Sequence, residues 1–360
     1  MGLILAAISN YGIRRRDNQL CINRPEIRQL ASRCLFGAGK FLSGFAMAES
    51  DLASAVVDMI IRIHSKDDRR QNDLKMKTIC VVGAGLMGQQ IALQGAVSGF
   101  EVFCTDNSVE AMKKAQTFAI DWLSKQLEKG KMNEEQVNGI KQRLNFVAAL
   151  ERAANNADLV IEAIVEILAV KRELFAQLDQ ICPPHTILAT NSSYIVSSKI
   201  ADATSRPDKV LNMHFFNPAL VMKLVEVVQG PHVSDETVEK VLEVSRALGK
   251  VPTRVNKEIY GFVCNRVFSA ITKEACYMLD QGVASIEDID NAVRNGLGHP
   301  MGPLALLDLT GIDLEYNILM ERFRDTGDPK DRPSPAIAER YAVGNYGRKT
   351  GKGFYNYKSK

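Results

Sequence analysis

The chain has 360 residues, of which 46% are hydrophobic and 24% charged, so it can bury a full core and is long enough for more than one domain. The net charge is only +3, and most of it comes from the first 48 residues, where seven Arg or Lys face two acids, which argues against a nucleic-acid partner. Seven cysteines without a CxxC pair indicate reduced thiols, metal-ligand spacing is absent, and no apolar run approaches the roughly 18 residues that would span a membrane.

Residues 1–75 stand apart as an extension that we expect to be helical or poorly ordered. Apolar stripes at helical spacing predict one helix in 26–36 and another from Ser50, and the polar segment 66–75 predicts a linker. Three interpretations remain open: an upstream start with little function, a small interaction hairpin, or an organelle-targeting segment with a basic start. We favour the first, which predicts a cytoplasmic protein; the third would predict the mitochondrial matrix.

A strand, a glycine turn and a helix start follow in residues 77–92, KTICVVGAGLMGQQIA. Gly83 permits a tight turn after the strand, Gly85 lets backbone amides approach a pyrophosphate, and Gly88 lets the helix pack closely on the strand. The phosphates would lie at the helix N-terminus, where free amides and the helix dipole favour anions. The expected cofactor-binding residues of this turn are Gly83, Gly85, Leu86, Met87 and Gly88.

The next strand, EVFCTD, ends in Asp106, about 20 residues beyond the glycine turn, where an acid binds the adenosine ribose of a dinucleotide. A carboxylate repels the extra ribose phosphate of NADP, and the following residues 107–109 offer no arginine to bind it. The pattern therefore predicts a Rossmann-type α/β domain with NAD as the cofactor.

Residues 107–149 predict two helices inserted after this strand, with a break near Gly130 and Asn133. Beyond the insertion, the apolar runs 159–163 (LVIEA) and 186–189 (TILA) predict further buried parallel strands.

Residues 190–228 are the most informative part of the chain, because one histidine and one lone acid each lie in an apolar, strand-like run. His214 ends the first run, in MHFFNP, and Glu226 lies among valines and leucines in KLVEVV. Adjacent strands would bring them together, and a carboxylate on one ring nitrogen fixes the tautomer and strengthens the other nitrogen as a base. We therefore predict His214 as the general base for an alcohol whose hydride goes to nicotinamide, with Glu226 orienting it.

From about Ile259 to Lys360 the sequence shows helical stripes and no strand signal. A long helix is predicted to end near Gly282, and Ser285 with Asp288 resembles a capping box that opens the next helix. A break at residues 300–303 precedes another helix. The basic loop GRKTGKGF lacks the spacing of a phosphate-binding Walker loop, so we interpret it as a structural turn.

From Met76 to Lys360 the chain resembles the L-3-hydroxyacyl-CoA dehydrogenases, above all the short single-function 3-hydroxybutyryl-CoA dehydrogenases. The shared motifs, in the family's order and near its spacing, are VVGAGLMGQQIA, DLVIEAIVE with VKRELF, TNSS, MHFFNP, KLVEVV, GFVCNR, GHPMGPLALLDLTGID and GRKTGKGFYNY. The resemblance implies a Rossmann NAD-binding domain at 76–258 and an all-helical domain at 259–360. It also implies an acyl-CoA substrate held between the two domains and a homodimer formed through the helical one.

The resemblance further implies two hydrogen-bond donors to the substrate, Ser193 and Asn265, which would hold the reacting oxygen or the thioester carbonyl without adding a charge. The family usually has Asn-Thr-Ser followed by Ser or Thr, whereas Tyr194 follows the two serines here. A register shifted by one residue would make Ser192 the ligand.

Four more site residues follow only from the resemblance. Glu166 and Lys171 would lie near the nicotinamide ribose, Asn217 near the cofactor amide, and Lys129 at the phosphates of CoA. From the residues alone, the first two would form an ordinary salt bridge on a helix face, Asn217 would be a turn residue before a proline, and Lys129 a solvated lysine.

The function implied is interconversion of an (S)-3-hydroxyacyl-CoA and its 3-oxoacyl-CoA, with short chains such as 3-hydroxybutyryl-CoA and acetoacetyl-CoA. One alternative is a dehydrogenase of the same fold that acts on a hydroxy acid without CoA, against which Lys129 and HFFNP argue. Another is a structural protein recruited from this fold, as in the lens crystallins. The presence of Ser193, His214, Glu226 and Asn265 argues against that alternative.

Overall fold

The structure, a computed structural model, describes residues 14–16, 19–21 and 76–357, and the chain divides into two compact units, Met1–Lys75 and Met76–Lys360. In the first unit, strands β1 (Arg14–Arg16) and β2 (Gln19–Cys21) pair antiparallel. The helices predicted in 26–36 and from Ser50, and the predicted linker 66–75, lie outside the described residues.

The second unit is built on an eight-stranded sheet with the order β10-β9-β8-β7-β6-β3-β4-β5. Neighbouring strands are parallel except for β8 and β9, which are antiparallel. The direction in which strands are added reverses between β3 and β6, and ligands of such sheets bind outside the carboxyl ends of the strands at this switch point. The strands are β3 (Thr78–Val82), β4 (Glu101–Thr105), β5 (Leu144–Phe146), β6 (Leu159–Glu162), β7 (Ile187–Thr190), β8 (Val210–Phe215), β9 (Leu224–Val228) and β10 (Val251–Val255).

Every residue of β6, β7 and β8 is buried, as expected of central strands that are covered on both faces. The helices that connect the strands are α4 (Leu86–Val97), α5 (Val109–Glu128), α6 (Glu134–Arg143), α7 (Leu150–Ala154), α8 (Leu168–Ile181) and α9 (Asp235–Ala247). The insertion contains the two predicted helices, α5 and α6, separated by Gly130 at φ 62° and by a capping box at Asn133. It also contains β5, which was not predicted.

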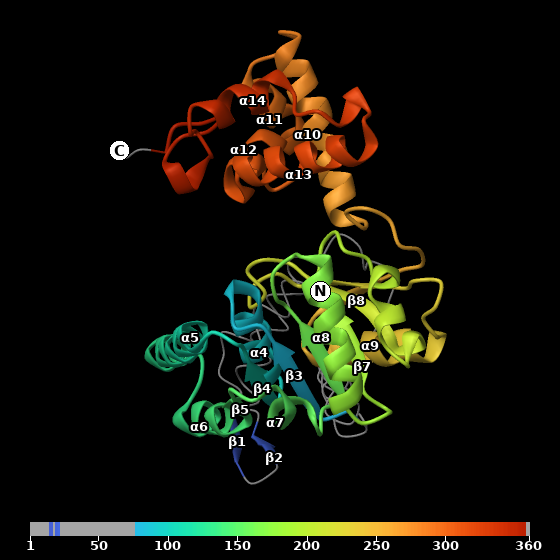
Figure 1. Cartoon of the computed structure of the whole chain (residues 1–360). Helices are drawn as coiled ribbons and strands as arrows, with labels where there is room; N and C mark the ends of the chain where they lie inside the picture. Colours follow the sequence, from blue (N-terminus) through green and yellow to red (C-terminus); the bar gives the residue numbers. More distant parts are fainter. Residues whose placement is uncertain (1–13, 17–18, 22–75, 358–360) are drawn as a thin grey trace, which may run out of the picture. The chain divides into compact units, whose positions relative to one another are not determined.

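Five helices form the C-terminal part and are gathered together in orange and red in Figure 1. They are α10 (Cys264–Asp280), α11 (Ile286–Gly296), α12 (Pro303–Thr310), α13 (Ile312–Thr326) and α14 (Pro335–Ala342). Their shared core includes Cys276, Leu304, Leu307 and Ile312. The predicted start of α11 is confirmed, because the Ser285 hydroxyl accepts from Asp288 N at 3.1 Å.

Short 3-10 turns complete the second unit: η1 (Ser197–Lys199), η2 (Ala201–Ala203), η3 (Pro207–Lys209), η4 (Pro329–Asp331) and η5 (Arg348–Thr350). The GRKTGKGF loop contains η5, and the amides that follow it are bound by the buried carboxylate of Asp308, which accepts from Phe354 N at 2.8 Å and from Tyr355 N at 2.9 Å. A side chain at Gly353 would lie 2.0 Å from that carboxylate. These contacts give the loop a structural role.

The predicted fold class is therefore confirmed: a Rossmann-type domain is followed by a helical domain. Within the described part of the chain, no helix combines the length and the apolar character needed to cross a membrane.

Candidate active site

The glycine turn after β3 leaves room for a ligand at one position and is closely packed at the other two. Gly83 has φ +104°, and a Cβ there would lie 2.6 Å from Ala163 O; a Cβ at Gly88 would lie 1.7 Å from Gly83 O. By contrast, no described atom lies within 4 Å of a Cβ built at Gly85. Gly85 is the N-cap of α4, whose first amides lack intrahelical partners. Open space at the positive end of a helix fits the pyrophosphate of a dinucleotide.

Leu86 and Met87 lie in the first turn of α4, beside this space, and Leu86 is 60% exposed. Asp106 follows β4, where its two oxygens each accept a backbone amide at 2.7 Å, one from Ala84 and one from Ser108. The carboxylate thus joins the glycine turn to the N-cap of α5. Each oxygen keeps a further lone pair that is available for a ribose hydroxyl.

His214 and Glu226 face each other directly across the antiparallel pair β8 and β9. Nδ1 of His214 lies 2.9 Å from Oε2 of Glu226, and both side chains are buried. The other carboxylate oxygen, Oε1, accepts from the amides of Val263 at 3.0 Å and Cys264 at 2.8 Å, at the start of α10. The predicted pairing of this histidine with this acid is thus present in the structure.

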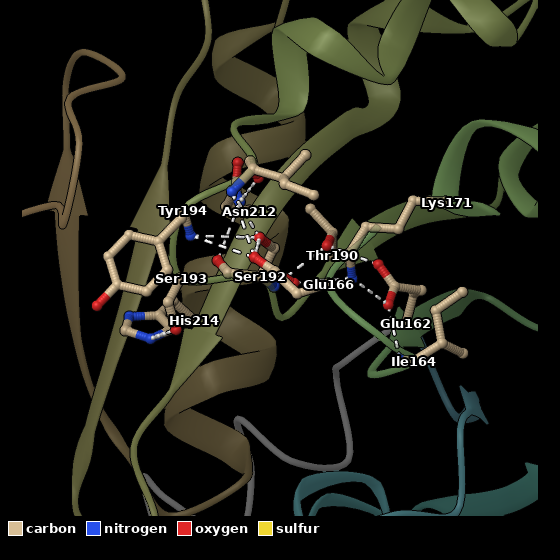
Figure 2. Close-up of polar contacts among 11 residues, drawn as sticks. Glu162, Ile164, Glu166, Lys171, Thr190, Ser192, Ser193, Tyr194, Asn212 and His214 are labelled. Atoms are coloured by element: carbon tan, nitrogen blue, oxygen red, sulfur yellow. Dashed lines mark hydrogen bonds and ion pairs between the residues drawn. The ribbon is translucent and has the colours of Figure 1, made fainter. Parts of the chain in front are cut away.

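The second nitrogen of His214, Nε2, lies 2.9 Å from the hydroxyl of Ser193, which follows β7 (Figure 2). The rings of Phe216 and Phe262 lie 4.6 and 5.4 Å from the imidazole ring, centroid to centroid. A proton on Nδ1 satisfies the carboxylate, and in that tautomer the lone pair of Nε2 faces the Ser193 hydroxyl. It can take a proton from a group bound next to Ser193.

The two adjacent serines of TNSS have different surroundings. Ser192 is buried; its hydroxyl donates to Glu166 and accepts from Ile195 N at 2.7 Å. Only Ser193 of the two is placed against His214. This geometry favours the unshifted register.

Glu166 and Lys171 do come together, though not as a pair on one helix face. Lys171, in the first turn of α8, is 1% exposed, and its Nζ lies 2.6 Å from Glu162 Oε1 and 3.2 Å from Glu166 Oε2. Glu166 precedes the helix, and its side chain is 41% exposed. A ligand therefore has access to the Glu166 carboxylate, whereas the ammonium of Lys171 is enclosed by two carboxylates.

The remaining predicted residues lie in different places. Asn217 follows β8, is exposed, and has its Oδ1 3.5 Å from Gln90 Nε2 of α4. Asn265 lies in the first turn of α10, directly after Cys264, whose amide binds Glu226. Lys129 is an exposed residue at the C-cap of α5, in the insertion.

Two buried charged residues of this region were missed by the sequence reasoning. Glu162 ends β6, and the signal that marked it was the one used for Glu226, a lone acid in an apolar strand. Lys250 precedes β10, and its ammonium donates to the carbonyls of Ala219 and, at 3.1 Å, of Met222. Burial, together with the charge of Lys223, lowers the pKa of Lys250 to about 8. These bonds anchor the segment that follows Asn217.

A Rossmann sheet whose glycine turn opens onto free helix amides, with a histidine–carboxylate pair at the same edge of the sheet, defines the class of nicotinamide-dependent dehydrogenases. Residues 78–259 match the family model described as "3-hydroxyacyl-CoA dehydrogenase, NAD binding domain", and residues 261–357 match "3-hydroxyacyl-CoA dehydrogenase, C-terminal domain". The chain belongs to the 3-hydroxyacyl-CoA dehydrogenase family of NAD-dependent oxidoreductases, as the sequence motifs predicted.

Similar proteins agree with this membership. A probable 3-hydroxybutyryl-CoA dehydrogenase of Bacillus subtilis is 43% identical over 80% of this chain and 99% of its own length. The human mitochondrial hydroxyacyl-coenzyme A dehydrogenase is 40% identical over 79% of this chain and 92% of its own. The crystal structure of the (S)-3-hydroxybutyryl-CoA dehydrogenase of Ralstonia eutropha is 38% identical, with a TM-score of 0.74 over 79% of this chain and all of that one.

Proposed function

We propose that this NAD-dependent dehydrogenase interconverts short-chain (S)-3-hydroxyacyl-CoA and 3-oxoacyl-CoA, with His214 as its general base. NAD, when bound at the glycine turn, supplies the hydride acceptor. The C–H bond electrons leave as hydride, the O–H bond breaks, and the proton goes to Nε2 of His214 as the carbonyl forms. Glu226 stabilises the imidazolium that results, and the proton returns by the same path in the reductive direction.

Ser193 and Asn265 are the proposed substrate donors. The Ser193 hydroxyl is already placed against Nε2 of His214, so an alcohol oxygen bound there would meet both the base and a neutral donor. Asn265 contributes from the first turn of α10. The observation that supports this proposal most directly is the chain of hydrogen bonds through His214: its Nδ1 lies 2.9 Å from Glu226 Oε2, and its Nε2 lies 2.9 Å from Ser193 Oγ.

We assign the cofactor to the glycine turn, with Asp106 on the adenosine ribose and Glu166 and Asn217 toward the nicotinamide side. Lys171, being enclosed, acts through Glu166 rather than as a separate ligand. Lys129 is proposed for the phosphates of CoA, because an exposed ammonium suits them.

The decisive experiment measures NADH oxidation with acetoacetyl-CoA, with longer 3-oxoacyl-CoA homologues, and with acetoacetate lacking CoA. We expect the highest kcat/KM with acetoacetyl-CoA and inhibition by free CoA. Equal activity with the free acid, and no inhibition by CoA, would favour a dehydrogenase of non-CoA hydroxy acids. Absence of turnover with every substrate, despite NADH binding, would favour the structural alternative.

We further propose a homodimer formed through the helical domain. The start of α10 presents apolar side chains to solvent: its N-cap, Val263, is 45% exposed, and Val267 in its first half is 54% exposed. The helix packs on its own domain through later residues, Thr272, Ala275 and Cys276. Light scattering should give twice the chain mass of 39.8 kDa. A monomer at micromolar concentration would contradict this proposal.

We propose a cytoplasmic location; if residues 1–75 act as a transit segment, the location would instead be the mitochondrial matrix. Imaging of the full chain and of a chain that begins at Met76, each fused to a fluorescent protein, separates the two. Organelle import that depends on residues 1–75 would establish the second location.

A further inference from the structure

Glu162 and Lys171 form a buried ion pair at the carboxyl ends of β6 and β7, and Glu162 has no part in the proposed hydride transfer. Glu162 is fully buried, and its Oε1 accepts from Lys171 Nζ at 2.6 Å and from Ile164 N at 2.7 Å. Its other oxygen accepts from the Thr190 hydroxyl at 2.7 Å. Ions lose their hydration at such depth, and this loss is offset only where their remaining hydrogen-bonding groups are satisfied. Both oxygens of Glu162 meet that condition.

The pair is connected to the loop that carries Ser193 by one route through Thr190. The Thr190 hydroxyl donates to Glu162 and accepts from Ser192 N at 3.1 Å. Two consecutive hydrogen bonds through the Thr190 hydroxyl therefore connect the buried carboxylate of Glu162 to the backbone directly before Ser193.

A second route runs through Lys171 and Glu166, as Figure 2 shows. Lys171 Nζ lies 3.2 Å from Glu166 Oε2, and Glu166 Oε1 accepts from the Ser192 hydroxyl. That hydroxyl also accepts from Ile195 N at 2.7 Å. The loop on both sides of Ser193 is thus held by groups that Glu162 orders.

We propose that Glu162 is a positioning residue, which acts through Lys171 and Thr190 to fix the loop that presents Ser193 to His214. This inference deepens the proposed function and rests on it. Ser193 lies 2.9 Å from His214 Nε2, and a displacement of about 1 Å would take this contact outside hydrogen-bonding distance. Misplacements of about that size at a reacting centre lower rates by up to about a hundredfold.

The test compares Glu162→Gln with a matched control, Asp179→Asn. The carboxamide of glutamine keeps the shape of Glu162 but has only one acceptor oxygen. In one orientation its NH2 group would face the Lys171 ammonium, and in the other it would lose the hydrogen bond donated by Thr190. Asp179 lies at the other end of α8, is also buried, and also pairs with a cation and an amide: Arg206 Nε at 2.6 Å and Ser205 N at 2.8 Å.

Two measurements are made on each variant at a temperature where circular dichroism shows it folded. The first is kcat with acetoacetyl-CoA and NADH, and the second is hydrogen–deuterium exchange of the peptide that contains residues 190–196. We expect Glu162→Gln to lower kcat by about tenfold to a hundredfold and to speed exchange in this peptide. Asp179→Asn should lower the melting temperature yet leave kcat within about twofold and this exchange unchanged.

Ser192→Ala provides a second variant that is independent of the buried charge, so the inference stays testable if Glu162→Gln does not fold. It should also lower kcat and speed exchange, and in the double variant the two effects on kcat should not multiply, because both act through one loop. Unchanged kcat and exchange in the folded Glu162 variant, or in Ser192→Ala, would overturn the inference.

The outcomes also separate this inference from the proposed function. Wild-type turnover of acetoacetyl-CoA with unaffected variants would overturn the positioning role alone. A wild-type chain without turnover would overturn the proposed function, and exchange of residues 190–196 would still decide whether Glu162 orders the loop.

Discussion

At the scale of single residues, the two nitrogens of His214 have different partners, a carboxylate at Nδ1 and a hydroxyl at Nε2. In the proposed mechanism, the proton that the ring gains during alcohol oxidation would therefore be on the nitrogen that faces Ser193, and Glu226 would balance the resulting charge from the other side. Removing either partner should therefore affect the same step.

We expect His214→Ala to lower turnover by about 10²–10⁴-fold and Glu226→Gln to lower it by about a hundredfold. A glutamine has a single acceptor oxygen, so it cannot serve both His214 and the amides of Val263 and Cys264. NADH binding should persist in both variants because the glycine turn is unchanged. Steady-state kinetics and NADH fluorescence measure the two properties.

The double variant tests whether the residues act as a unit. Its loss of turnover should be close to that of His214→Ala alone, since an acid that orients an absent base contributes nothing. If the two losses multiply, or if Glu226→Gln keeps near-normal turnover, the base lies elsewhere.

We propose that Asp106 makes the enzyme prefer NAD to NADP. The double change Asp106→Ser with Asn107→Arg should shift the ratio of kcat/KM for NADH over NADPH toward NADPH by about tenfold or more, because like charge is removed and a phosphate partner is added. A small loss of melting temperature should accompany it, since Asp106 binds the amides of Ala84 and Ser108. Wild-type enzyme with equal efficiency toward both cofactors would contradict the assignment.

The sequence predicted the pairing of His214 with Glu226 because a lone acid in an apolar strand requires a partner, and strand neighbours are few. Glu162 carried the same signal, yet its partners, Lys171 and Thr190, come from two other elements whose meeting depends on the order of strands. The register of Ser192 and Ser193 could not be decided because a turn, unlike a strand, does not alternate its side chains regularly. The three-dimensional path of the loop determines which serine faces the histidine.

At the scale of elements, we expect opposite effects from adding a methyl group at two glycines near the start of α4, Gly85 and Gly88. Gly88→Ala should destabilise the fold by about 1–3 kcal/mol or more, because its Cβ would lie 1.7 Å from Gly83 O. Gly85→Ala should leave the melting temperature nearly unchanged, since its φ of −69° suits alanine and the space is open. Its methyl group should instead weaken NADH binding. Thermal melts and NADH titrations of both variants measure these effects. A stable Gly88→Ala variant, or a Gly85→Ala variant with normal NADH binding, would contradict the prediction.

Helix α13 contains a carboxyl whose ionisation opposes folding. Burial raises the pKa of Glu315 from 4.5 to about 7, so the folded chain holds a proton that the unfolded chain has released between these values. The stability that the protonated Glu315 carboxyl gives the folded chain, relative to the ionised form, is fully present below pH 4.5 and is lost as the pH rises through about 7. Glu315→Gln should therefore gain stability relative to wild type at about pH 8, by on the order of 1–2 kcal/mol after allowance for solvent screening.

Melting temperatures of both chains at about pH 5.5 and about pH 8 provide the measurement. The advantage of the variant should be larger at the higher pH. A difference between the two chains that does not change with pH would show that Glu315 does not titrate in this range.

The sequence predicted the central strands and several long helices, such as α5, α10 and α11, whereas it did not predict the short edge strands β5 and β10, and the reason is physical. β5 has three half-buried residues, LNF, and pairs with β4 at the end of the sheet. β10 is at the opposite end and contains a proline and an arginine among its five residues. Edge strands are covered on fewer sides than central ones, so their residues do not need the continuous apolar run that marked β6 and β7.

At the scale of the whole molecule, the chain divides between Lys75 and Met76, the point where the family resemblance begins. A chain that starts at Met76 should fold, melt within a few degrees of the full chain, and keep kcat within about twofold, because the sheet and the helical domain are complete without the first unit. Expression, calorimetry and turnover of the truncated chain measure this. Insolubility or loss of most activity would show that residues 1–75 are integral.

Glu226 belongs to the Rossmann domain, yet its Oε1 is bound by the two amides with which the helical domain begins. The helical domain therefore cannot be replaced without changing the surroundings of Glu226. A chimera in which an unrelated domain replaced everything after residue 258 would keep the nucleotide-binding turn, but Glu226, the proposed partner of the base, would lose the two hydrogen bonds that it accepts from Val263 N and Cys264 N. On the proposed mechanism, dinucleotide binding could be transferred to another protein with the Rossmann domain alone, whereas the hydride chemistry would also require the start of α10.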